Sequence, residues 1–470
     1  MNHSIKSIKI PPELQKMNDI FTAHGFEAYL VGGAVRDSLL KKKAMDWDIA
    51  TNATPQQVME IFHKVIPTGI AHGTVTVHFL GHQIETTTYR TDIGYSDGRH
   101  PDHVAYAATI EEDLSRRDFT MNAIAVNLTN GALVDPFDGQ TDIQNGLIRS
   151  VRDPVERFSE DGLRPIRALR FASQLGFKIE QHTFEAISDF RVKNRTAGIS
   201  MERFRDEFIK ILQTAKPSAG LRLMEQTGIL HLFIPEFSPC RGCTQGDVRG
   251  FHDFDVLDHC LYACDGAPAE NLIVRLSALF HDIGKPSVKK STHLDNKELF
   301  TFYNHETVSA ELTEKILVRL KFPNSTVSAV THLVQNHMFH YEPAWTDAAV
   351  RRFLVRVKQE CLDDLFDLRI ADVYGMHNAP VRLHDSEVCR NLCELKDRIA
   401  KVTEEAAVLS VKDLAVNGKD LMEAGIPAGK KMGFILHGLL EAVLDDPAQN
   451  TKETLIQIAA ALYGQLQSEG

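Results

Sequence analysis

The sequence lacks the marks of a membrane protein, a secreted protein and a strongly basic nucleic-acid-binding protein. No stretch of the 470 residues offers the ~18 consecutive apolar residues that a membrane-spanning helix needs. The first residues, Met1–Pro12, have no apolar core of the kind found in signal peptides. The net charge is −11, so the overall field does not attract nucleic acid. We therefore expect a cytoplasmic protein with no membrane partner, which meets any RNA or DNA through local basic patches such as Lys41–Lys43.

Cysteine is also scarce, and the seven cysteines form an odd set. An odd number argues against a framework of disulfides. Cys240 and Cys243 form a C-x-x-C pair, and Cys260 and Cys264 follow further along the chain. A structural zinc site is one interpretation. The later pair fits one face of a helix better, which makes zinc the less favoured interpretation.

The composition is that of a globular protein with several domains. The apolar fraction of 43% is ordinary and large enough for real cores. Residues 1–150 alternate short apolar runs with helical stretches, which is typical of an α/β unit, and helical periodicity dominates from residue 151 onward. The sequence therefore predicts an α+β protein with an α/β head. The predicted parts are the head at 1–150, a helical neck at 151–238, a helical body at 239–378 and a helical tail at 379–470.

The most informative stretch combines a glycine turn with two carboxylates. Tyr29–Val31 is predicted to be a buried strand that enters Gly32 and Gly33, after which a helix begins. Asp46 and Asp48 follow, and in a strand their side chains would lie on one face. Adjacent carboxylates repel at neutral pH unless a cation lies between them, and glycines before a helix let backbone N–H groups approach a triphosphate. Together these features predict divalent-metal chemistry on a nucleotide.

A third carboxylate follows on a predicted β-hairpin. Residues 75–80 and 83–89, joined by Gly81 and His82, have the pattern of two paired strands. Glu85 on the second strand is a candidate to stand beside the two aspartates. A solvated strand face explains this glutamate equally well.

Five short motifs follow one another at residues 30–37, 46–48, 116–123, 135–139 and 160–171. Their order resembles that of the class II tRNA nucleotidyltransferases, the CCA-adding enzymes, and bacterial poly(A) polymerases share the same head. The resemblance covers nearly the whole chain. It implies a polymerase-β-like nucleotidyltransferase head with a mixed sheet, followed by an all-α neck, body and tail. It also implies template-independent addition of C, C and A to tRNA 3′ ends from CTP and ATP, with release of pyrophosphate.

The resemblance gives roles to residues of the head. Asp46 and Asp48 would hold two Mg²⁺ ions, with Glu85 as a further catalytic carboxylate. One ion would lower the pKa of the primer 3′-hydroxyl and the other would stabilise the leaving pyrophosphate. The nucleotide contacts that it implies are Gly32, Gly33, Arg36, Arg117 and Asn122. An ion pair with Asp113 or Asp118 is the alternative for Arg117.

Asp161 and Arg164 are the candidate readers of the incoming base. A carboxylate only accepts hydrogen bonds and a guanidinium only donates them. Cytosine and adenine each offer an amino donor beside a ring acceptor, whereas uracil and guanine present an acceptor beside an N–H donor. An Asp–Arg pair on successive helical turns therefore accepts C and A and rejects U and G, because the wrong base leaves a buried polar group unpaired. In the resembling family these two positions act as a protein template.

Two more arginines, Arg167 and Arg170, continue the same stripe and are candidates to touch base or phosphate. The alternative is a simple helix pair between Glu160 and Arg164, with the other arginines solvated. Pro165 predicts that a helix starts or kinks at this point, which bears on where Arg164 is aimed.

A second candidate metal site lies in the body. His281 and Asp282 follow an apolar helical run, and imidazole together with carboxylate suits a divalent transition metal. With His259 upstream and Asp372 downstream, the order H…HD…D resembles the HD phosphohydrolase superfamily. This implies hydrolysis of a phosphoester, for instance a 2′,3′-cyclic phosphate at an RNA end. Further candidates are His305 and His337 for a second metal and Lys285 for a phosphate. A retained helical scaffold without catalysis is the alternative.

The tail combines glycines with lysines at predicted helix starts, in residues 417–422 and 425–433. Helix N-termini with exposed N–H groups bind phosphates. The stretch resembles the tail of class II CCA-adding enzymes, which holds the elbow of tRNA. Lys419, Lys430 and Lys431 are therefore candidate tRNA contacts, and turns between helices are the alternative.

Three other functions remain open from the sequence. The chain could be an A-adding enzyme that completes CC ends: the segment Tyr89–His103, which contains residues 95–102, resembles the flexible loop that A addition requires, and this fits both full CCA addition and A addition. A poly(A) polymerase is less favoured, since no strongly basic extension follows Gly464. A different class is an HD phosphohydrolase whose head has become an RNA-binding module.

Overall fold

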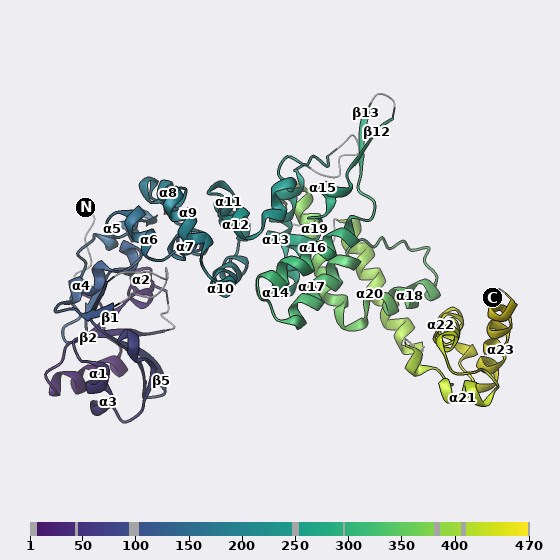
Figure 1. Ribbon diagram of the computed structural model, residues 1–470, viewed down its shortest axis with the longest axis horizontal. Helices are drawn as coiled ribbons and strands as arrows, with labels where there is room; N and C mark the ends of the chain where they lie inside the picture. The colour runs from purple at the N-terminus through teal and green to yellow at the C-terminus, as the bar shows by residue number, and fades with distance from the viewer. Residues whose placement is uncertain are drawn as a thin grey trace. The chain divides into compact units, whose positions relative to one another are not determined.

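The computed structural model describes residues 7–42, 46–93, 103–246, 253–294, 297–379, 386–405 and 410–468. Residues 95–102, which carry the loop prediction, lie outside the described ranges. The chain divides into two compact units, with the break between Pro235 and Glu236; Figure 1 shows the elements of both. This break lies close to the predicted boundary at 238, and the division into four parts stays a prediction. No helix in the described ranges is long and apolar enough to cross a membrane.

The head is built on one mixed sheet, as predicted. Its strands are β1 (Ala28–Val31), β2 (Asp48–Thr51), β3 (Val65–Gly69), β4 (Thr74–Phe79), β5 (His82–Thr88), β8 (Ala125–Asn127) and β9 (Leu133–Val134). Their order is β3-β4-β5-β2-β1-β8-β9. β2 and β5 are parallel, and the other neighbours are antiparallel. β4 and β5 form the predicted hairpin.

Helices and a small second sheet complete the head. The helices are α1 (Pro12–Ala23), α2 (Gly33–Leu39), α3 (Pro55–Ile61), α4 (Ile110–Ser115) and α5 (Gly139–Asn145), and the small sheet pairs β6 (Arg90–Ile93) with β7 (His103–Tyr106). α3 begins after Thr54, whose hydroxyl accepts from Gln57 N in a capping box, and proline occupies the first turn. All four residues of β1 are buried, and Tyr29 and Val31 pack with Ile110 and Leu114 of α4.

The neck is helical and packs against the head in the same compact unit. Its helices are α6 (Pro154–Glu160), α7 (Arg164–Leu175), α8 (Gln181–Ile187), α9 (Phe190–Ala197), α10 (Met201–Leu212), α11 (Pro217–Gln226) and α12 (Ile229–Phe233). Pro165 lies in the first turn of α7, so the proline starts a helix here rather than kinking one. Stacked rings of Phe204, Phe208 and Phe233 hold α10 against α12.

The body is mostly helical, with one hairpin that the sequence analysis did not predict. Its helices are α13 (Val256–Gly266), α14 (Leu272–Phe280), α15 (Lys285–Val288), α16 (His305–Arg319), α17 (Asn324–Asn336), α18 (Asp347–Val357), α19 (Leu362–His377) and α20 (Glu387–Glu405). The hairpin pairs β12 (Lys290–Leu294) with β13 (Lys297–Thr301). Leu392, Leu395 and Ile399 of α20 share the core of the body, which therefore continues beyond the predicted end at 378.

Close packing of α13 on α19 brings distant segments of the body together. A Cβ atom on Gly375 would lie only 2.8 Å from the carbonyl oxygen of His259 and 2.8 Å from Ala263 N, which is closer than real side chains approach. Only glycine lets the two helix backbones come this near. This packing brings together two candidate metal ligands, because His259 lies on α13 and Asp372 on α19.

The tail has a small core of its own. Its helices are α21 (Gly418–Glu423), α22 (Lys430–Asp445) and α23 (Lys452–Ser468). Leu421, Ile435, Leu439 and Leu455 are fully buried in this core. α21 begins with a capping box in which the Asn417 side chain accepts from main-chain N–H groups of the first turn.

Candidate functional site

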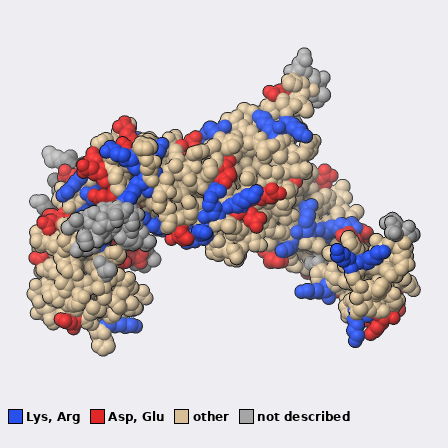
Figure 2. Space-filling view, in the orientation of Figure 1, with Lys and Arg blue, Asp and Glu red and all other residues tan. Residues whose placement is uncertain are grey.

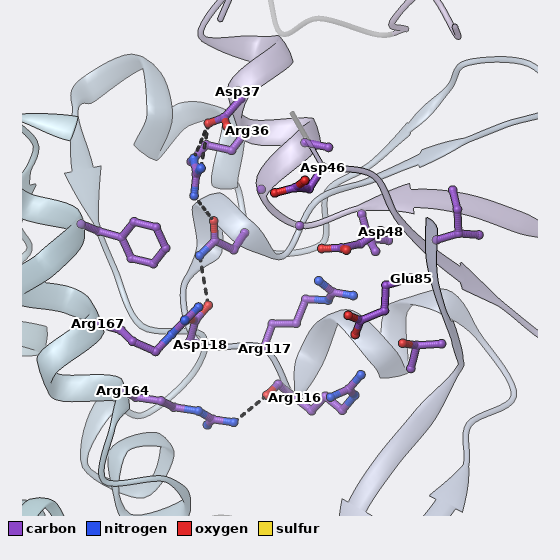
Figure 3. A pocket seen from close by; sticks show the side chains of 18 of the residues that line it. Arg36, Asp37, Asp46, Asp48, Glu85, Arg116, Arg117, Asp118, Arg164 and Arg167 are labelled. Carbon is purple, nitrogen blue, oxygen red and sulfur yellow. Dashed lines mark hydrogen bonds and ion pairs between the residues drawn. The ribbon is translucent and has the colours of Figure 1, made fainter. Parts of the chain in front are cut away.

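A cavity of about 750 Å³ lies in the first unit between the sheet of the head and helix α7. Figure 3 shows Asp46, Asp48 and Glu85 on one side and Arg164 and Arg167 on the other. Eight cationic and five acidic side chains are among the described residues that line it. This cationic excess stands out in a chain with a net charge of −11, and it favours a polyanionic ligand such as a triphosphate.

Three carboxylates form the acidic wall, which consists of Asp46, Asp48 and Glu85. Asp48 and Glu85 are direct partners in the parallel pairing of β2 with β5, so their side chains leave the same face of the sheet. Asp46 lies in a bend before β2 rather than in the strand, which corrects the expectation that a strand carries both aspartates. Burial, then the charge of Glu85, raises the pKa of Asp48 to about 6, although Arg117 acts in the opposite direction.

The glycine turn allows a cation and a carboxylate to meet. Gly32 has φ 71°, and a Cβ atom on it would lie 3.2 Å from Arg117 Nη1 and 3.6 Å from Asp48 Oδ2. A side chain at this position would be strained and would crowd the Arg117 guanidinium, while its contact with Asp48 would be ordinary. Arg117 also pairs with Asp113 at 3.1 Å, so the ion pair named as its alternative is present, while its Nη1 faces the acidic wall.

A continuous chain of hydrogen bonds crosses the cavity from α2 to α7. Arg36 donates to Asp37 through Nε and Nη2 and to Asn122 Oδ1 through Nη1 at 2.9 Å. Asn122 donates to Asp118, which also accepts from Arg167 at 2.7 Å. Figure 3 draws this chain. Burial opposes the charge of Asp118, but Arg167 and the hydrogen bonds outweigh it and lower the pKa of that carboxyl to about 2.

The predicted template pair lies at the junction of two helices. Asp161 follows the last residue of α6 and Arg164 is the first residue of α7, so they do not occupy successive turns of one helix. Arg164 lines the cavity and donates to Glu160 at 2.6 Å, which is the helix pair named as the alternative. Asp161 is not among the lining residues, and its carboxylate accepts from Arg203 at 2.8 Å.

The two following arginines of α7 do line the cavity, but each has a carboxylate partner. Arg170 donates to buried Glu207 at 2.8 Å, and Arg167 pairs with Asp118. The ring of Phe171 lies beneath them, with its centroid 3.5 Å from Arg170 Cζ and 5.4 Å from Arg167 Cζ. The arginines are therefore oriented by packing and ion pairs rather than solvated.

Several lining residues were not singled out from the sequence. They are Asp37, Arg90, Arg116, Asp118, Phe171 and Lys210. Asp118 belongs to the motif at 116–123, so its position was a usable signal. Lys210 lies on another helix, and nothing in its sequence neighbourhood indicates the cavity.

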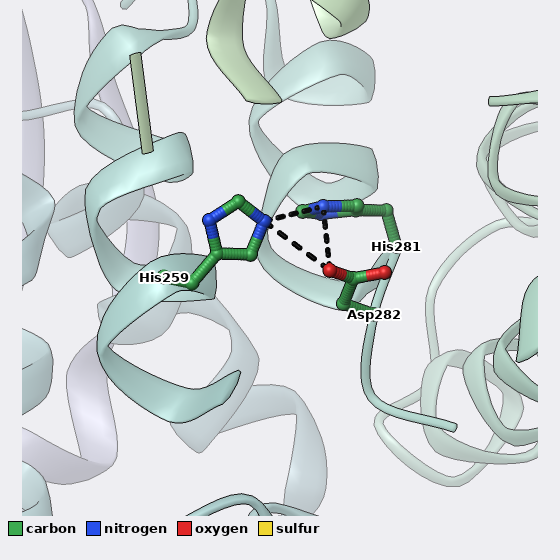
Figure 4. A group of neighbouring side chains, drawn as sticks. All are labelled: His259, His281 and Asp282. Atoms are coloured by element: carbon green, nitrogen blue, oxygen red, sulfur yellow. Dashed lines mark hydrogen bonds and ion pairs between the residues drawn. The ribbon is translucent and has the colours of Figure 1, made fainter. Parts of the chain in front are cut away.

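A second cluster, in the body, brings four predicted ligands together. His259 Nε2 lies 3.0 Å from His281 Nε2 and 3.2 Å from both Asp282 Oδ2 and Asp372 Oδ1. Figure 4 shows the first three residues facing one another. All four side chains are buried. Burial opposes protonation of His281, but Asp282 and Asp372 outweigh it and raise the pKa of this imidazole to about 10.

Main-chain contacts fix the ring of His281. Its Nδ1 lies 2.8 Å from the carbonyl oxygen of Ala278, which accepts a hydrogen bond from that nitrogen. Nε2 therefore faces the carboxylates, as a metal-ligating imidazole does. The four ligand atoms fit a divalent transition metal by chemistry and by convergence.

A cavity of about 590 Å³ opens beside this cluster. Lys285 and Arg369 line it and pair with Asp282 and Asp372, each at 2.5 Å. The exposed ring of Tyr303 and the exposed side chain of Met338 also line it. The cationic side chains of Lys285 and Arg369 suit an anionic group beside the histidine–aspartate cluster.

The remaining candidates lie elsewhere. Lys419, Lys430 and Lys431 are exposed on the tail, and Lys431 donates to the carbonyl oxygen of Leu466; Figure 2 shows basic side chains on this part of the chain. Cys260 and Cys264 are buried on α13, as the helix-face interpretation predicts. Within the described ranges, the groups of side chains that could hold a metal contain no cysteine.

Comparisons with known proteins agree with this geometry. Residues 28–149 match the poly A polymerase head domain, residues 176–240 the RNA- and SrmB-binding site of polymerase A, and residues 296–459 the tRNA nucleotidyltransferase domain 2. A solved structure of the Bacillus stearothermophilus CCA-adding enzyme in complex with CTP has a TM-score of 0.70 at 28% identity, covering 98% of this chain and 99% of that one.

Two relatives extend the likeness over nearly the full length. The CCA-adding enzyme of Lactobacillus johnsonii is 32% identical over 451 residues, which is 95% of both chains. That of Ligilactobacillus salivarius is 33% identical over 455 residues, which is 97% of this chain and 96% of the relative. With identity at this level from end to end, the chain belongs to the CCA-adding enzyme family.

Proposed function

We propose that this protein adds the CCA sequence to the 3′ ends of tRNA from CTP and ATP, releases pyrophosphate, and acts in the cytoplasm. One observation carries the proposal: a single cavity presents three carboxylates opposite a set of arginines. The relatives named CCA-adding enzymes support it, as does the Bacillus stearothermophilus enzyme that was solved with CTP. The acidic wall suits the transfer step and the cationic residues suit the triphosphate.

The acidic wall fits a divalent cation of the magnesium type. Its donors are all carboxylate oxygens, which Mg²⁺ prefers. Burial, then the charge of Glu85, raises the pKa of Asp48, and a bound cation would oppose both effects. Asp46, Asp48 and Glu85 would hold the ion or ions. When bound, Mg²⁺ supplies acidity at the primer hydroxyl and neutralises charge on the leaving pyrophosphate.

Arg117 and Arg36 would have different tasks: the first would bind the nucleotide and the second would position the residues around it. Arg117 has its Nη1 beside the acidic wall, where it would donate to a phosphate oxygen. Arg36 already donates to Asp37 and Asn122, so it positions the loop around Gly33. Asn122 and Gly32 contribute by shaping this wall.

To read an incoming base, Asp161 and Arg164 would have to replace their present ion pairs by hydrogen bonds to the base. Arg164 currently pairs with Glu160, and Asp161 pairs with Arg203. An incoming C or A would offer both groups the hydrogen bonds that they make now, whereas U or G would leave each one unpaired. The neck would therefore rearrange around these side chains when the correct nucleotide enters.

The four-part division gives each region a task in this scheme. Residues 1–150 form the catalytic head, 151–238 the base-reading neck, 239–378 the body and 379–470 the tail. Lys419, Lys430 and Lys431 lie on the exposed surface of the tail and would contact tRNA phosphates.

The decisive experiment supplies tRNA that lacks its 3′ CCA with labelled CTP, ATP or both. Incorporation of two C and one A supports the proposal. Incorporation of A only, and only onto tRNA that already ends in CC, identifies an A-adding enzyme instead. Long A tails on unrelated RNA identify a poly(A) polymerase. No incorporation at all, with a folded protein, overturns every nucleotidyltransferase function.

A second candidate function, metal-dependent hydrolysis of a phosphoester, rests on the cluster in the body. His259, His281, Asp282 and Asp372 converge as a buried ligand set. A divalent transition metal bound there would supply the Lewis acidity that hydrolysis requires. Lys285 and Arg369 line the adjacent cavity and would attract the phosphate group.

Its test is release of phosphate or ring opening from an RNA with a 2′,3′-cyclic phosphate end. The metal-loaded protein should hydrolyse this end, and His281→Ala should not. A wild-type protein that binds metal but leaves the end intact overturns this second function and leaves nucleotide addition untouched.

A further inference from the structure

Helix α18 belongs to two hydrophobic cores at once. Its side chains Val350, Phe353 and Leu354 are buried in the core of the body. The next side chain, Val355, packs against the core of the tail. Body and tail lie in the same compact unit, and α18 contacts α22 of the tail directly; Figure 1 labels both helices. The contact between α18 and α22 is therefore a joint through which the body sets the position of the tail.

Arg351 closes this joint from the side of the body, and it is buried. Its Nε donates to the carbonyl oxygen of Leu444 at 2.7 Å, and its Nη2 donates to that of Asp445 at 3.2 Å. These are the last two residues of α22, where the final carbonyls have no partner within the helix. A cation at the C-terminus of a helix also matches the negative end of the helix dipole. Arg351 therefore holds one end of α22.

The other end of α22 carries two of the candidate tRNA contacts. Lys430 and Lys431 are the first two residues of this helix of 16 residues. At about 1.5 Å per residue the helix is about 24 Å long, so a tilt of about 10° at its C-terminus moves its N-terminus by about 4 Å. Such a shift exceeds the roughly 3 Å between the partners of a hydrogen bond, so it breaks a contact with a phosphate. The position of Lys430 thus depends on how firmly the far end of the helix is held.

We propose that Arg351 is a positioning residue for tRNA: it fixes α22 to the body, so that Lys430 lies where it meets a phosphate of the bound tRNA. Arg351 acts through α22 and does not itself touch the RNA, since its side chain is buried in the joint. The inference rests on the proposed function of the tail lysines, whereas the two hydrogen bonds of Arg351 stand without it.

The test measures KM for tRNA, KM for CTP and kcat in the full-length chain. Arg351→Ala should raise KM for tRNA by about threefold, the scale of one lost phosphate contact, while KM for CTP and kcat stay unchanged. The salt dependence of tRNA binding should become about one unit less steep, although the substituted side chain is buried. A variant that is merely less well folded would lose kcat instead, because fewer molecules are active.

The matched control is Arg352→Ala. This neighbour also bridges α18 and α22, through ion pairs of 2.7 Å with Glu441 and Asp445, but its side chain is 42% exposed. Exposed ion pairs contribute little, so all three kinetic constants should stay at the parent values. Arg351→Lys keeps a cation at the joint and should raise KM for tRNA by a smaller factor. It carries the test if circular dichroism shows that Arg351→Ala is unfolded.

A double variant tests whether the two ends of α22 act together. When Lys430→Ala has already removed the phosphate contact, Arg351→Ala should add little, so the two effects on KM for tRNA should not be additive. Additive effects in folded variants overturn the proposal, as does an unchanged KM for tRNA in folded Arg351→Ala. If Lys430→Ala alone leaves KM for tRNA unchanged, the proposed function of that lysine fails and the inference fails with it, which separates this result from a failure at Arg351 alone.

Discussion

Carboxylates gather in both the head and the body, but their neighbouring side chains and their access differ. The head presents Asp46, Asp48 and Glu85 at the edge of an open cavity ringed by arginines. The body buries His259 and Asp372 with their neighbours between helices. Oxygen donors at an open cavity suit ions that arrive with a nucleotide and leave with pyrophosphate. Buried imidazoles suit an ion that stays bound.

The difference follows from the secondary structure that carries the ligands. In the head, the pairing of β2 with β5 places Asp48 and Glu85 side by side, so the carboxylates face outward from one sheet surface. In the body, the ligands come from separate helices that meet around a common centre, and helix packing closes that centre on most sides. A strand register thus builds an open site and helix packing builds a closed one.

The largest effect is expected from Asp48→Asn, which tests whether the acidic wall and the cluster in the body work independently. The substitution removes a charged ligand from the acidic wall, so nucleotide addition should fall by at least about 10²-fold, the scale expected when a key electrostatic group of a transition state is lost. The metal content of the body should not change. The measurements are single-turnover incorporation of CTP and bound metal per chain. Glu60→Gln, an exposed carboxylate on α3, is the matched control.

The converse substitution is His281→Ala. It removes a ligand and opens a gap among Asp282, Asp372 and His259, so the retained metal and any hydrolysis should be lost. CCA addition should stay within about twofold of the parent, because a substitution in one site usually has little effect on a distant, independent site. Loss of both activities in a folded variant would contradict the separation of the two centres.

Base selection is a second difference between the two regions, because we expect nucleotide discrimination at the cavity of the head and not at the cluster in the body. Asp161→Ala removes the acceptor from the proposed template, so the preference for C and A over U and G should fall by about 10²-fold, the scale on which an unpaired polar group rejects a wrong substrate. Competition between CTP and UTP measures it. If the folded variant keeps its full preference, the pairing of Asp161 with Arg203 is structural and another group reads the base.

The sequence predicts the acidic wall better than the arginine wall. Glu85 lies on the second strand of the hairpin that the turn at Gly81 predicts, and Asp48 lies on a predicted strand, which in the structure begins after Asp46. The partners of Arg164 and Arg170 depend on how α6, α7 and α10 pack. A stripe of arginines at helical spacing does not reveal that Glu207 will be buried against one of them.

The sequence also predicts the body only in part. The motif around His281 identified the cluster, but the hydrogen bonds that turn the rings of His305 and His337 come from carbonyls that only the folded chain places. The β12–β13 hairpin was missed because its strands are short and polar. The sequence of residues 290–301 does not alternate polar and apolar residues, so the usual signal of a half-buried strand is missing.

A further test asks whether the arginine wall depends on its buried carboxylates. Glu207 is 4% exposed at its side chain and pairs with Arg170 and Lys210. Glu207→Gln leaves the Arg170 charge without its partner, so the free energy of unfolding should fall by about 3 kcal/mol, as for other broken buried pairs. Denaturant unfolding at neutral pH measures it, and the metal centre of the body should be unaffected.

The loss of stability caused by Glu207→Gln should depend on pH. Burial disfavours the charge of Glu207, but Arg170 and the other cations outweigh it and hold the pKa of this carboxyl below its usual range. The stabilisation is therefore present above the usual carboxyl range and is lost as pH falls through the lowered pKa. The difference between parent and Glu207→Gln should shrink at acid pH. A difference that stays constant down to acid pH would contradict the ion pair as its source.

Substitutions in the tail should have the smallest effect. They should affect nucleotide addition, which uses tRNA, and leave hydrolysis of a small phosphoester unchanged. Lys430 is exposed, whereas the ammonium of Lys431 donates to Leu466 O at the end of α23. Lys430→Ala should weaken tRNA binding a few-fold and make its salt dependence about one unit less steep, as expected for one lost phosphate contact. Lys431→Ala should change stability more than the salt slope. Hydrolysis of a small phosphoester should respond to neither substitution, because it needs no grip on tRNA. Equal losses of hydrolysis and addition in Lys430→Ala would mean that the tail serves both centres, and the contrast between an open site for tRNA and a closed site in the body would fail.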